Sequence, residues 1–234
     1  MRKKIKSGYI VAIDGPAGAG KSTVSRLLAL DLNGRLLDTG AMYRSVAYFA
    51  VKEKVTTATG FAKIARKLKF DYDSRNQSLL VNGIEMGQRL RTQNVSGLAS
   101  KVSAFKGVRE TLTARQRSLA KQWATECPVV VEGRDIGTVV FPDVEYKFYV
   151  TADPRVRAER RFHQLKKQGA KEVSLKAILK ANMERDKQDS SRKHAPLKCA
   201  QDAIVVDTSK MSINQVVQFM SEHIKGRIEL VGEQ

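Results

Sequence analysis

The sequence has no long apolar run, few cysteines and no internal repeat or low-complexity segment. No hydrophobic stretch approaches the roughly 18 residues that a membrane-spanning helix needs, and the basic start, Met1–Lys6, is not followed by the apolar segment of a secretion signal. The two cysteines, Cys127 and Cys199, lack the spacing of metal ligands. These absences argue against a membrane protein or a zinc site, and they predict reduced thiols in a cytoplasmic protein.

The composition is that of a soluble globular protein with an excess of positive charge. At 234 residues, with 42% hydrophobic and 28% charged residues, the chain is long enough for one α/β core. The net charge of +18 has three interpretations: a nucleic-acid-binding surface, attraction of small polyanions such as nucleotides, or a basic surface that is only solvated. The basic residues are spread along the whole chain without interleaved aromatic residues, which favours the last two.

The segment Gly15-Pro-Ala-Gly-Ala-Gly-Lys-Ser22 fits the phosphate-loop pattern G-x-x-x-x-G-K-[ST]. A buried strand, Tyr9–Asp14, precedes it and a helical pattern, Lys21–Leu32, follows it, as the motif requires. The glycines let consecutive amides point at an anion, and the helix start adds its positive dipole end. Lys21 is predicted to reach the β- and γ-phosphates of ATP and the Ser22 hydroxyl to ligate Mg²⁺. The alternative is a glycine-rich turn that binds nothing, which the strand–loop–helix context disfavours. The predicted ATP-binding residues are Gly15, Pro16, Ala17, Gly18, Ala19, Gly20, Lys21, Ser22 and Thr23.

Short apolar runs alternate with helical patterns, which predicts an α/β fold with a parallel sheet and crossover helices. Between Lys69 and Asn94 the pattern changes, and Asn82-Gly83 is a tight-hairpin signal, so a small antiparallel insert is expected there. Two helices, broken near Lys106, follow from Asn94 to Trp123. The five strands expected in the main sheet are Tyr9–Asp14, Gly34–Asp38, Val129–Glu132, Glu145–Val150 and Ala203–Asp207.

A strongly basic helix is expected after the fourth of these strands. Asp153 caps it, Pro154 opens it and Gly169 closes it, so the helix covers Arg155–Gln168. Such a helix is either a solvated surface or a lid that closes over phosphates. Ser174 is expected to cap a second helix with Leu175, Ile178, Leu179 and Met183 turned inward. Arg185, Asp189 and Arg192 share one face of this helix, which is also the pattern of an ordinary surface ion-pair ladder.

Two further observations narrow the class of nucleotide-binding protein. The chain has no N-K-x-D motif for reading guanine, which argues against a GTPase. The strand Val129–Glu132 ends in an acidic residue that could lie beside a metal, but it runs directly into Gly133-Arg-Asp135, unlike the corresponding strand of a motor ATPase. These features favour a small kinase with a mobile insert and a lid.

The chain resembles the bacterial CMP/dCMP kinases, the cytidylate kinase family, from about Tyr9 to Ile224. The run from Glu132 to Asp143, E-G-R-D-I-G-T-V-V-F-P-D, is highly specific for that family. The other motifs are Gly15–Thr23, Leu37–Arg44, Arg91-Thr-Gln with Ala99–Ser103 and Val108-Arg109, and, more weakly, Glu184-Arg-Asp with Asp189, Arg192 and Ala195-Pro-Leu197.

The resemblance implies a single P-loop kinase domain over 1–234, with an insert that binds the nucleoside monophosphate at about 65–110 and a lid at about 153–173. It implies transfer of the γ-phosphoryl group of MgATP to CMP or dCMP in pyrimidine metabolism, by a cytoplasmic monomer without a nucleic-acid partner. Arg44, Arg134 and Arg192 match the residues that hold the monophosphate. Asp135 and Arg109, with Ser100 nearby, would read cytosine rather than uracil. Arg185 and Asp189 match the sugar contacts, Thr39 and Tyr43 complete the CMP site, and Lys21, Arg157, Arg160 and Arg161 are the predicted catalytic residues.

Two rival functions remain open at this point. One is a different small P-loop kinase, acting on another monophosphate or on a small hydroxyl metabolite. The other is a nucleic-acid-binding or ribosome-associated module that uses its +18 charge and has lost catalysis.

Overall fold

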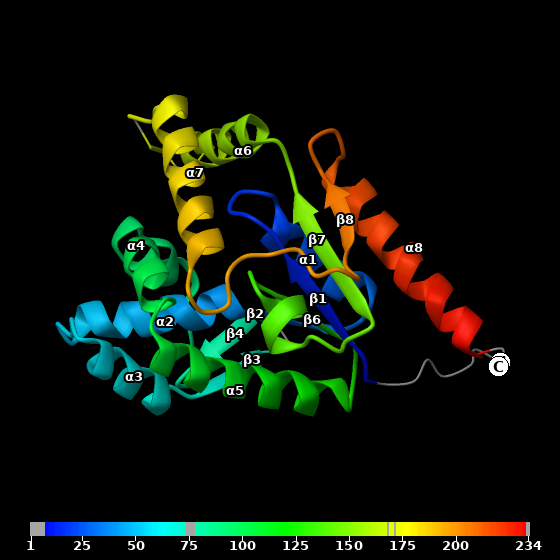
Figure 1. Cartoon of the computed structure of the whole chain (residues 1–234), viewed down its shortest axis with the longest axis horizontal. Helices are drawn as coiled ribbons and strands as arrows, with labels where there is room; N and C mark the ends of the chain where they lie inside the picture. The colour runs from blue at the N-terminus through cyan, green and yellow to red at the C-terminus, as the bar shows by residue number, and fades with distance from the viewer. Residues whose placement is uncertain (1–7, 74–77, 168, 171, 233–234) are drawn as a thin grey trace.

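The computed structural model describes residues 8–73, 78–167, 169–170 and 172–232. Its centre is a five-stranded parallel sheet with the strand order β2-β6-β1-β7-β8 (Figure 1). Each bound lies within one residue of that predicted from the apolar runs, so the predicted α/β class and parallel sheet are confirmed. The strands are β1 (Ile10–Asp14), β2 (Arg35–Asp38), β6 (Val129–Glu132), β7 (Tyr146–Thr151) and β8 (Ile204–Asp207).

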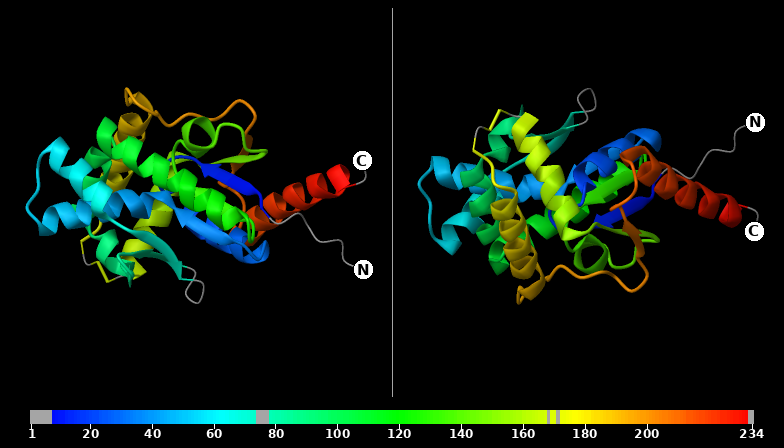
Figure 2. Two further views of the ribbon diagram at one scale, coloured as in Figure 1. Left: turned by 90° about the horizontal axis from the view of Figure 1, so that it is seen from below. Right: turned by 90° about the horizontal axis from the view of Figure 1, so that it is seen from above.

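Helices cover both faces of this sheet (Figure 2). Val130 of β6 packs in one apolar cluster, whereas its neighbours Val129 and Val131 pack in the other, because successive strand residues point to opposite faces. This burial on both faces explains why the strands are continuous apolar runs in the sequence. The helices α1 (Lys21–Asp31) and α8 (Ile213–Gly232) contribute to the first cluster, and α2 (Thr39–Lys52), α3 (Ala58–Lys67) and α5 (Lys106–Ala124) to the second.

The expected antiparallel segment forms a second, three-stranded sheet in the order β3-β4-β5. Its hairpin turns at Asn82 and Gly83, whose φ angles of 52° and 77° both lie in the left-handed region that such tight turns need. Two separate helices then follow, as predicted, with the break at 103–105. The elements are β3 (Phe70–Asp73), β4 (Ser78–Val81), β5 (Ile84–Glu85), the 3₁₀ turn η1 (Gly87–Arg91) and α4 (Gln93–Val102), and residues 74–77 of the predicted insert lie outside the described residues.

The basic helix α6 (Pro154–Lys167) packs against α7 (Leu175–Ser191) beyond the arrowheads of β1 and β7 in Figure 1. The Asp153 carboxylate accepts from the Arg155 amide at 2.8 Å and the Ser174 hydroxyl from the Ala177 amide at 3.3 Å, so both predicted caps are present. Gln168 and Lys171, within the predicted basic helix and lid, lie outside the described residues.

One expectation for α7 is wrong. Leu175 and Met183, expected to turn inward, are 41% and 55% exposed. The reason lies in the packing: α7 stands against α6 rather than against the sheet, and its one buried residue is Asp189. The segment is a helix as predicted, but Leu175 and Met183 are exposed instead of packed against an apolar layer.

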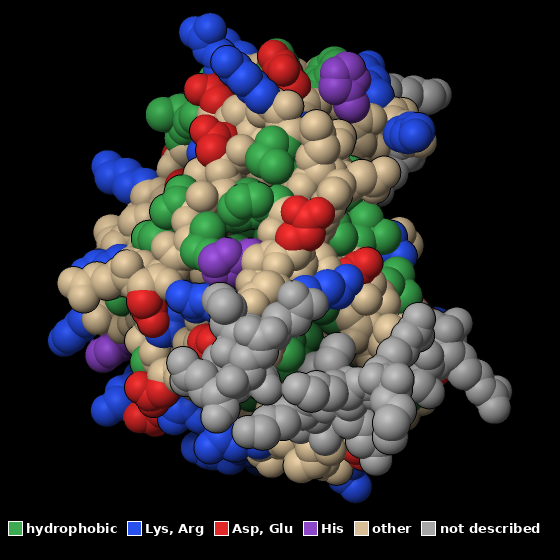
Figure 3. All heavy atoms as spheres, turned by 90° about the vertical axis from the view of Figure 1, so that its right-hand side faces the viewer, with side chains coloured by type: hydrophobic (Ala, Val, Ile, Leu, Met, Phe, Trp, Pro, Cys, Tyr) green, Lys and Arg blue, Asp and Glu red, His purple; other side chains and the backbone are tan. Residues whose placement is uncertain are grey.

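No described helix combines the length and the apolarity needed to cross a membrane. Where its atoms are described, the face in Figure 3 carries Lys and Arg side chains scattered among carboxylates and apolar groups. This face therefore has no continuous basic area, which agrees with the even spread of basic residues along the chain.

Candidate active site

The carboxyl ends of the parallel strands bring a row of polar residues to one edge of the sheet. Asp14, Asp38 and Glu132 end three neighbouring strands there, and the glycine loop leaves β1 between them. Gly15 is required at the exit, because it has a φ of 144° and a Cβ would lie 1.9 Å from the Val150 carbonyl oxygen. Gly20, with a φ of 89°, turns the chain into α1. Ligands of open α/β sheets bind at this edge.

Four carbonyl groups of the glycine loop each accept a hydrogen bond from a side chain, three of them from outside the motif and one from Lys21. The Gly15 carbonyl accepts from Arg134 Nη1 at 2.7 Å and the Ala17 carbonyl from Arg157 Nη1 at 2.9 Å. The Pro16 carbonyl accepts from Lys21 Nζ at 2.7 Å and the Ala19 carbonyl from the Thr208 hydroxyl at 3.3 Å. With these oxygens held, the first amides of α1 and the loop amides other than that of Ala17, which donates to Asp186 Oδ1 at 3.1 Å, are left for an anion. The Thr23 amide is different, since it donates to the Gly20 carbonyl at 3.1 Å.

The buried Lys21 and Glu132 and the exposed Ser22 form a polar group at the start of α1. Ser22 donates to Glu132 Oε1 at 2.8 Å, and Oε2 of the same carboxylate is buried without a partner. Burial and the neighbouring Asp38 raise the pKa of Glu132, while burial and the nearby Arg134 lower the pKa of Lys21 to about 7. Both shifts show groups that have lost water without gaining a full counter-charge. A polyphosphate and a divalent cation at this position would supply both missing charges.

Four arginines gather around Asp189 and Asp38 next to the glycine loop. Arg134 Nε donates to Asp189 Oδ2 at 3.0 Å, and Arg44 pairs with Asp38 at 2.8 Å. Burial and Arg134 lower the pKa of Arg185 to about 10. Three buried nitrogens of this cluster have no hydrogen-bond partner, namely Arg44 Nε, Arg185 Nε and Arg192 Nη2. Several guanidinium groups gathered in one cluster, with buried nitrogens still without a partner, are typical of a site for a doubly charged anion.

The predicted base-reading pair is assembled. The side chains of Arg109 and Asp135, each 7% exposed, form a buried ion pair, and the Arg109 guanidinium lies 5.6 Å from the centre of the Tyr43 ring. Arg109 Nη1 also donates to the Ser103 carbonyl at 3.1 Å, and the Ser103 hydroxyl donates to the Ser100 carbonyl at 2.8 Å. Ser100 is therefore joined to the pair through Ser103, a residue that the sequence did not single out.

The remaining predicted residues, Thr39 and three arginines of α6, differ in their burial and in their hydrogen-bond partners. Thr39 is buried and donates its hydroxyl proton to the Glu132 carbonyl at 2.7 Å. Arg157 is buried and bonded to the Ala17 and Ala152 carbonyls and to Asp186. Arg160 donates to Thr208, at 2.9 Å to the hydroxyl and 2.6 Å to the carbonyl. Arg161 is exposed and bonds only Gln164 among the described residues.

The family model described as Cytidylate kinase matches residues 11–226 of the chain. The chain belongs to the cytidylate kinase family. Cytidylate kinases from Citrifermentans bemidjiense and Thermosipho melanesiensis are 40% and 41% identical to it, covering 95% and 94% of this chain and 95% and 98% of their own. The cytidylate kinase of Pseudomonas paraeruginosa is 43% identical over 92% of this chain and 94% of its own. Among solved structures, a gluconokinase from Sinorhizobium meliloti superposes with a TM-score of 0.48 at 14% identity, over 98% of each chain.

Several residues of this kinase were missed from the sequence. Asp14 accepts from the Ile136 and Gly137 amides at 2.8 and 2.7 Å and so fixes the loop that carries Arg134 and Asp135. Burial raises its pKa to about 6. Asp38 and Asp186 lie inside motifs that the resemblance quoted, so a signal was present, whereas Thr208 lies in no motif.

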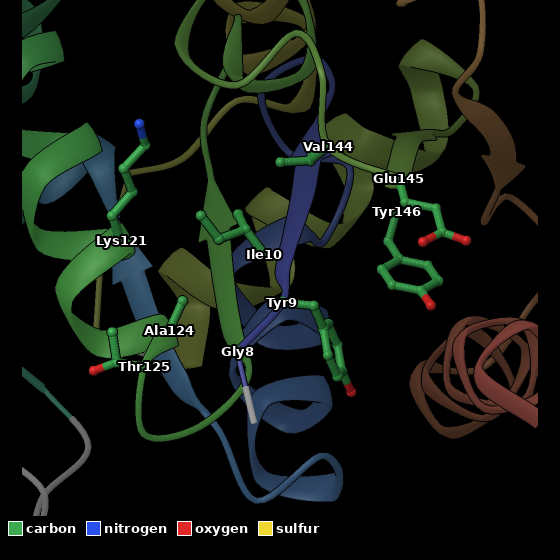
Figure 4. Close-up of a pocket in the computed structure, with 9 residues that line it drawn as sticks. All are labelled: Gly8, Tyr9, Ile10, Lys121, Ala124, Thr125, Val144, Glu145 and Tyr146. Carbon is green, nitrogen blue, oxygen red and sulfur yellow. The ribbon is translucent and has the colours of Figure 1, made fainter. Parts of the chain in front are cut away.

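A separate hollow of about 510 Å³ lies at the opposite, amino-terminal ends of β1 and β7 (Figure 4). The Tyr9 and Tyr146 rings stand edge to face at 5.3 Å on its wall, and Lys121 of α5 lines another side. None of the predicted site residues lines this hollow, and we assign it no role in the kinase.

Proposed function

We propose that this chain transfers the γ-phosphoryl group of MgATP to CMP or dCMP, giving ADP and CDP or dCDP. The observation that carries the proposal is Arg134, which donates to the Gly15 carbonyl of the glycine loop and to Asp189 of the arginine cluster. One side chain therefore joins a polyphosphate cradle to a second anion site. Two anions held side by side in this way are what in-line phosphoryl transfer requires.

Cytosine recognition would fall to the buried Arg109–Asp135 pair. Asp135 can accept from the cytosine N4 amino group while Arg109 donates to N3 or O2. Uracil has an O4 acceptor where cytosine has the N4 donor, and an N3–H donor where cytosine has the N3 acceptor. The pair would then face mismatched groups, and each buried polar group left without a partner would cost about 1–3 kcal/mol of binding free energy. Asp189 and Arg185 would contact the ribose, and they would set the preference between CMP and dCMP.

The residues at the start of α1 fit a magnesium ion. Among the described residues, no cluster of three or more His, Cys, Asp or Glu side chains is arranged to hold a resident metal. The site offers the Ser22 hydroxyl and the buried Glu132 carboxylate, of which one oxygen has no hydrogen-bond partner. Such a small set of protein ligands suits an ion that also binds phosphate and water. Ser22 and Glu132 would hold it. When bound, Mg²⁺ would neutralise charge on the transferring phosphoryl group.

This chain's own residues would supply the rest of the chemistry. The acceptor phosphate oxygen is already anionic, so positioning and positive charge matter more than a strong base. Lys21 lies at the loop, and Arg157, Arg160 and Arg161 lie on the helix beside it. Closure of α6 and α7 would exclude water, which would otherwise hydrolyse ATP. We propose that the protein acts on free nucleotides as a monomer in the cytoplasm.

A thermal-shift panel with coupled rate assays tests the acceptor. CMP and UMP carry the same phosphate and ribose, so UMP is the matched control for base reading. We expect a 100-fold excess over Kd of the correct ligand to add about 2.7 kcal/mol, or roughly 5–10 °C in Tm. CMP or dCMP should give the largest shift and the highest rates among CMP, dCMP, UMP, AMP and GMP. A tenfold preference for UMP or AMP would refute the acceptor, and salt-sensitive RNA binding without phosphoryl transfer would favour the nucleic-acid module.

The titration of Lys21 gives a pH-dependent prediction. Because burial lowers its pKa to about 7, most Lys21 is unprotonated at pH 8 in the free protein. The phosphates of ATP favour the charged form, so binding at pH 8 should take up close to one proton, and ATP affinity should fall as the pH rises above 7. Calorimetry in two buffers of different ionisation enthalpy, with EDTA to leave out the metal, measures the uptake. Lys21→Met should abolish it, and proton release in the unmodified protein would contradict the assignment.

A further inference from the structure

Asp186 on α7 closes a ring of hydrogen bonds around one residue of the glycine loop, Ala17. Its Oδ1 accepts from the Ala17 amide at 3.1 Å, and its Oδ2 accepts from Arg157 Nη1. The same Nη1 donates to the Ala17 carbonyl at 2.9 Å, so the ring returns to the residue where it began. Both polar groups of Ala17 are thus held by one ion pair.

This ion pair differs from a surface salt bridge in its burial and in what it joins. The Arg157 side chain is 6% exposed and that of Asp186 19%. Arg157 Nε also donates to the Ala152 carbonyl at 3.0 Å, so the guanidinium is fixed from the end of β7 as well as from α7. Exposed pairs lose most of their energy to water and side-chain entropy, whereas a pair held at several points in a dry setting keeps its geometry.

The contact acts directly on the phosphate cradle. Ala17 lies just before Gly18, and a Cβ at Gly18 would lie 3.3 Å from the Arg157 Cβ, so the helix α6 rests on the loop at this point. Turning the Ala17 peptide would change the direction of the amides that follow it. A loop that must present several amides at once needs such a peptide to be held before the ligand arrives.

We propose that Asp186 is a positioning residue for the donor nucleotide, which holds Arg157 and the Ala17 peptide together so that the loop is set for the triphosphate. The inference rests on the proposed function for the identity of that nucleotide. It also assigns Arg157 a role different from the one the sequence suggested. Its guanidinium serves the loop through protein acceptors, and Arg160 likewise donates to Thr208, so of the three predicted arginines of this helix the one left to approach the transferring group is Arg161.

Asp186→Asn tests the proposal, because asparagine keeps the shape and one acceptor but not the charge that binds Arg157. Glu184→Gln, two residues earlier on α7, is the matched control: its side chain is 61% exposed and its recorded partner is Lys180 at 4.0 Å. We expect Asp186→Asn to raise the Kd and KM for ATP about tenfold or more while the KM for CMP stays within about twofold. Glu184→Gln should change neither. Unchanged ATP binding, or equal rises for both nucleotides, would overturn the proposal.

A second variant and a direct measurement guard against a loss of folding. Arg157→Lys keeps the positive charge but has a single nitrogen, which cannot reproduce the guanidinium's bonds to Ala152, Ala17 and Asp186 together, so it should show the same ATP-specific loss. The double variant should be no worse than the worse single one, since both break one ring. Hydrogen exchange of the nucleotide-free protein should show Ala17 protected, and exposed in both variants. An Ala17 amide that exchanges freely in the unmodified protein would refute the ring.

These readouts separate the two hypotheses. Calorimetric ATP binding and amide exchange test Asp186 even if CMP is not the acceptor. Conversely, an unmodified protein that phosphorylates CMP keeps the proposed function even where Asp186→Asn binds ATP normally.

Discussion

Lys21→Met is expected to lower kcat for CMP phosphorylation by about 10²–10³-fold or more, while the protein folds as well as before. Lys21 is 4% exposed, and its Nζ donates to the Pro16 carbonyl rather than to a carboxylate. A preorganised donor at developing charge contributes about 3–4 kcal/mol to the transition state. A buried charge without a full counter-charge destabilises the fold, so methionine of similar length should leave Tm unchanged or raise it.

Lys147→Met is the matched control for this change. Lys147 is also a buried lysine that donates to a carbonyl five residues earlier, that of Pro142, but its second partner is Asp202 at 2.5 Å, outside the site. The Asp202 side chain is 62% exposed and stays solvated without Lys147, so Tm should fall only slightly while kcat of the folded protein stays within about twofold. Steady-state rates and thermal melts of both variants distinguish the cases. A Lys21→Met protein that retains a tenth of its turnover would contradict the role given to this lysine.

The strands and the glycine loop are predictable from sequence because their causes are local. A strand buried on both faces must be apolar along its length, as Val129–Val131 of β6 are before Glu132 at its carboxyl end. The sharp exit from β1 admits only glycine at position 15. The prediction that Leu175 and Met183 are buried was wrong, because helical spacing shows only that one face of the helix is apolar. It does not show whether another apolar surface packs against that face.

The contacts that set the site are not local, and the sequence does not contain them as a pattern. Asp186 and Ala17 are 169 residues apart and Thr208 and Ala19 are 189 apart, yet each pair is joined at the loop. Family motifs place the arginines in the right order along the chain. They do not tell which arginine donates to protein carbonyls, as Arg157 does. Nor do they tell which arginine has a buried nitrogen without a partner, as Arg192 has.

Arg134→Met is expected to lower kcat/KM for CMP by about two orders of magnitude or more. Hydrogen bonds to charged groups contribute about 1.5–3 kcal/mol each, and a guanidinium facing a monophosphate makes at least one and commonly two. The change also frees the Gly15 carbonyl and leaves Asp189 with Arg192 at 3.7 Å as its remaining ion-pair partner. Arg117→Met is the control, because Arg117 likewise donates to carbonyls, those of Val139 and Val140 at 2.8 Å, but outside the site.

The pattern across both substrates distinguishes this residue from its neighbours. Because Arg134 donates to the Gly15 carbonyl of the glycine loop and to Asp189 of the arginine cluster, its loss should raise the KM for ATP and the KM for CMP together. Asp186→Asn should raise only the first, and changes at Arg109 or Asp135 should act on the base. Steady-state kinetics with each substrate varied in turn reads these patterns directly. Equal behaviour of Arg134→Met and Arg117→Met would mean that the two anion sites are not joined through Arg134, since only a shared contact makes one substitution weaken both nucleotides.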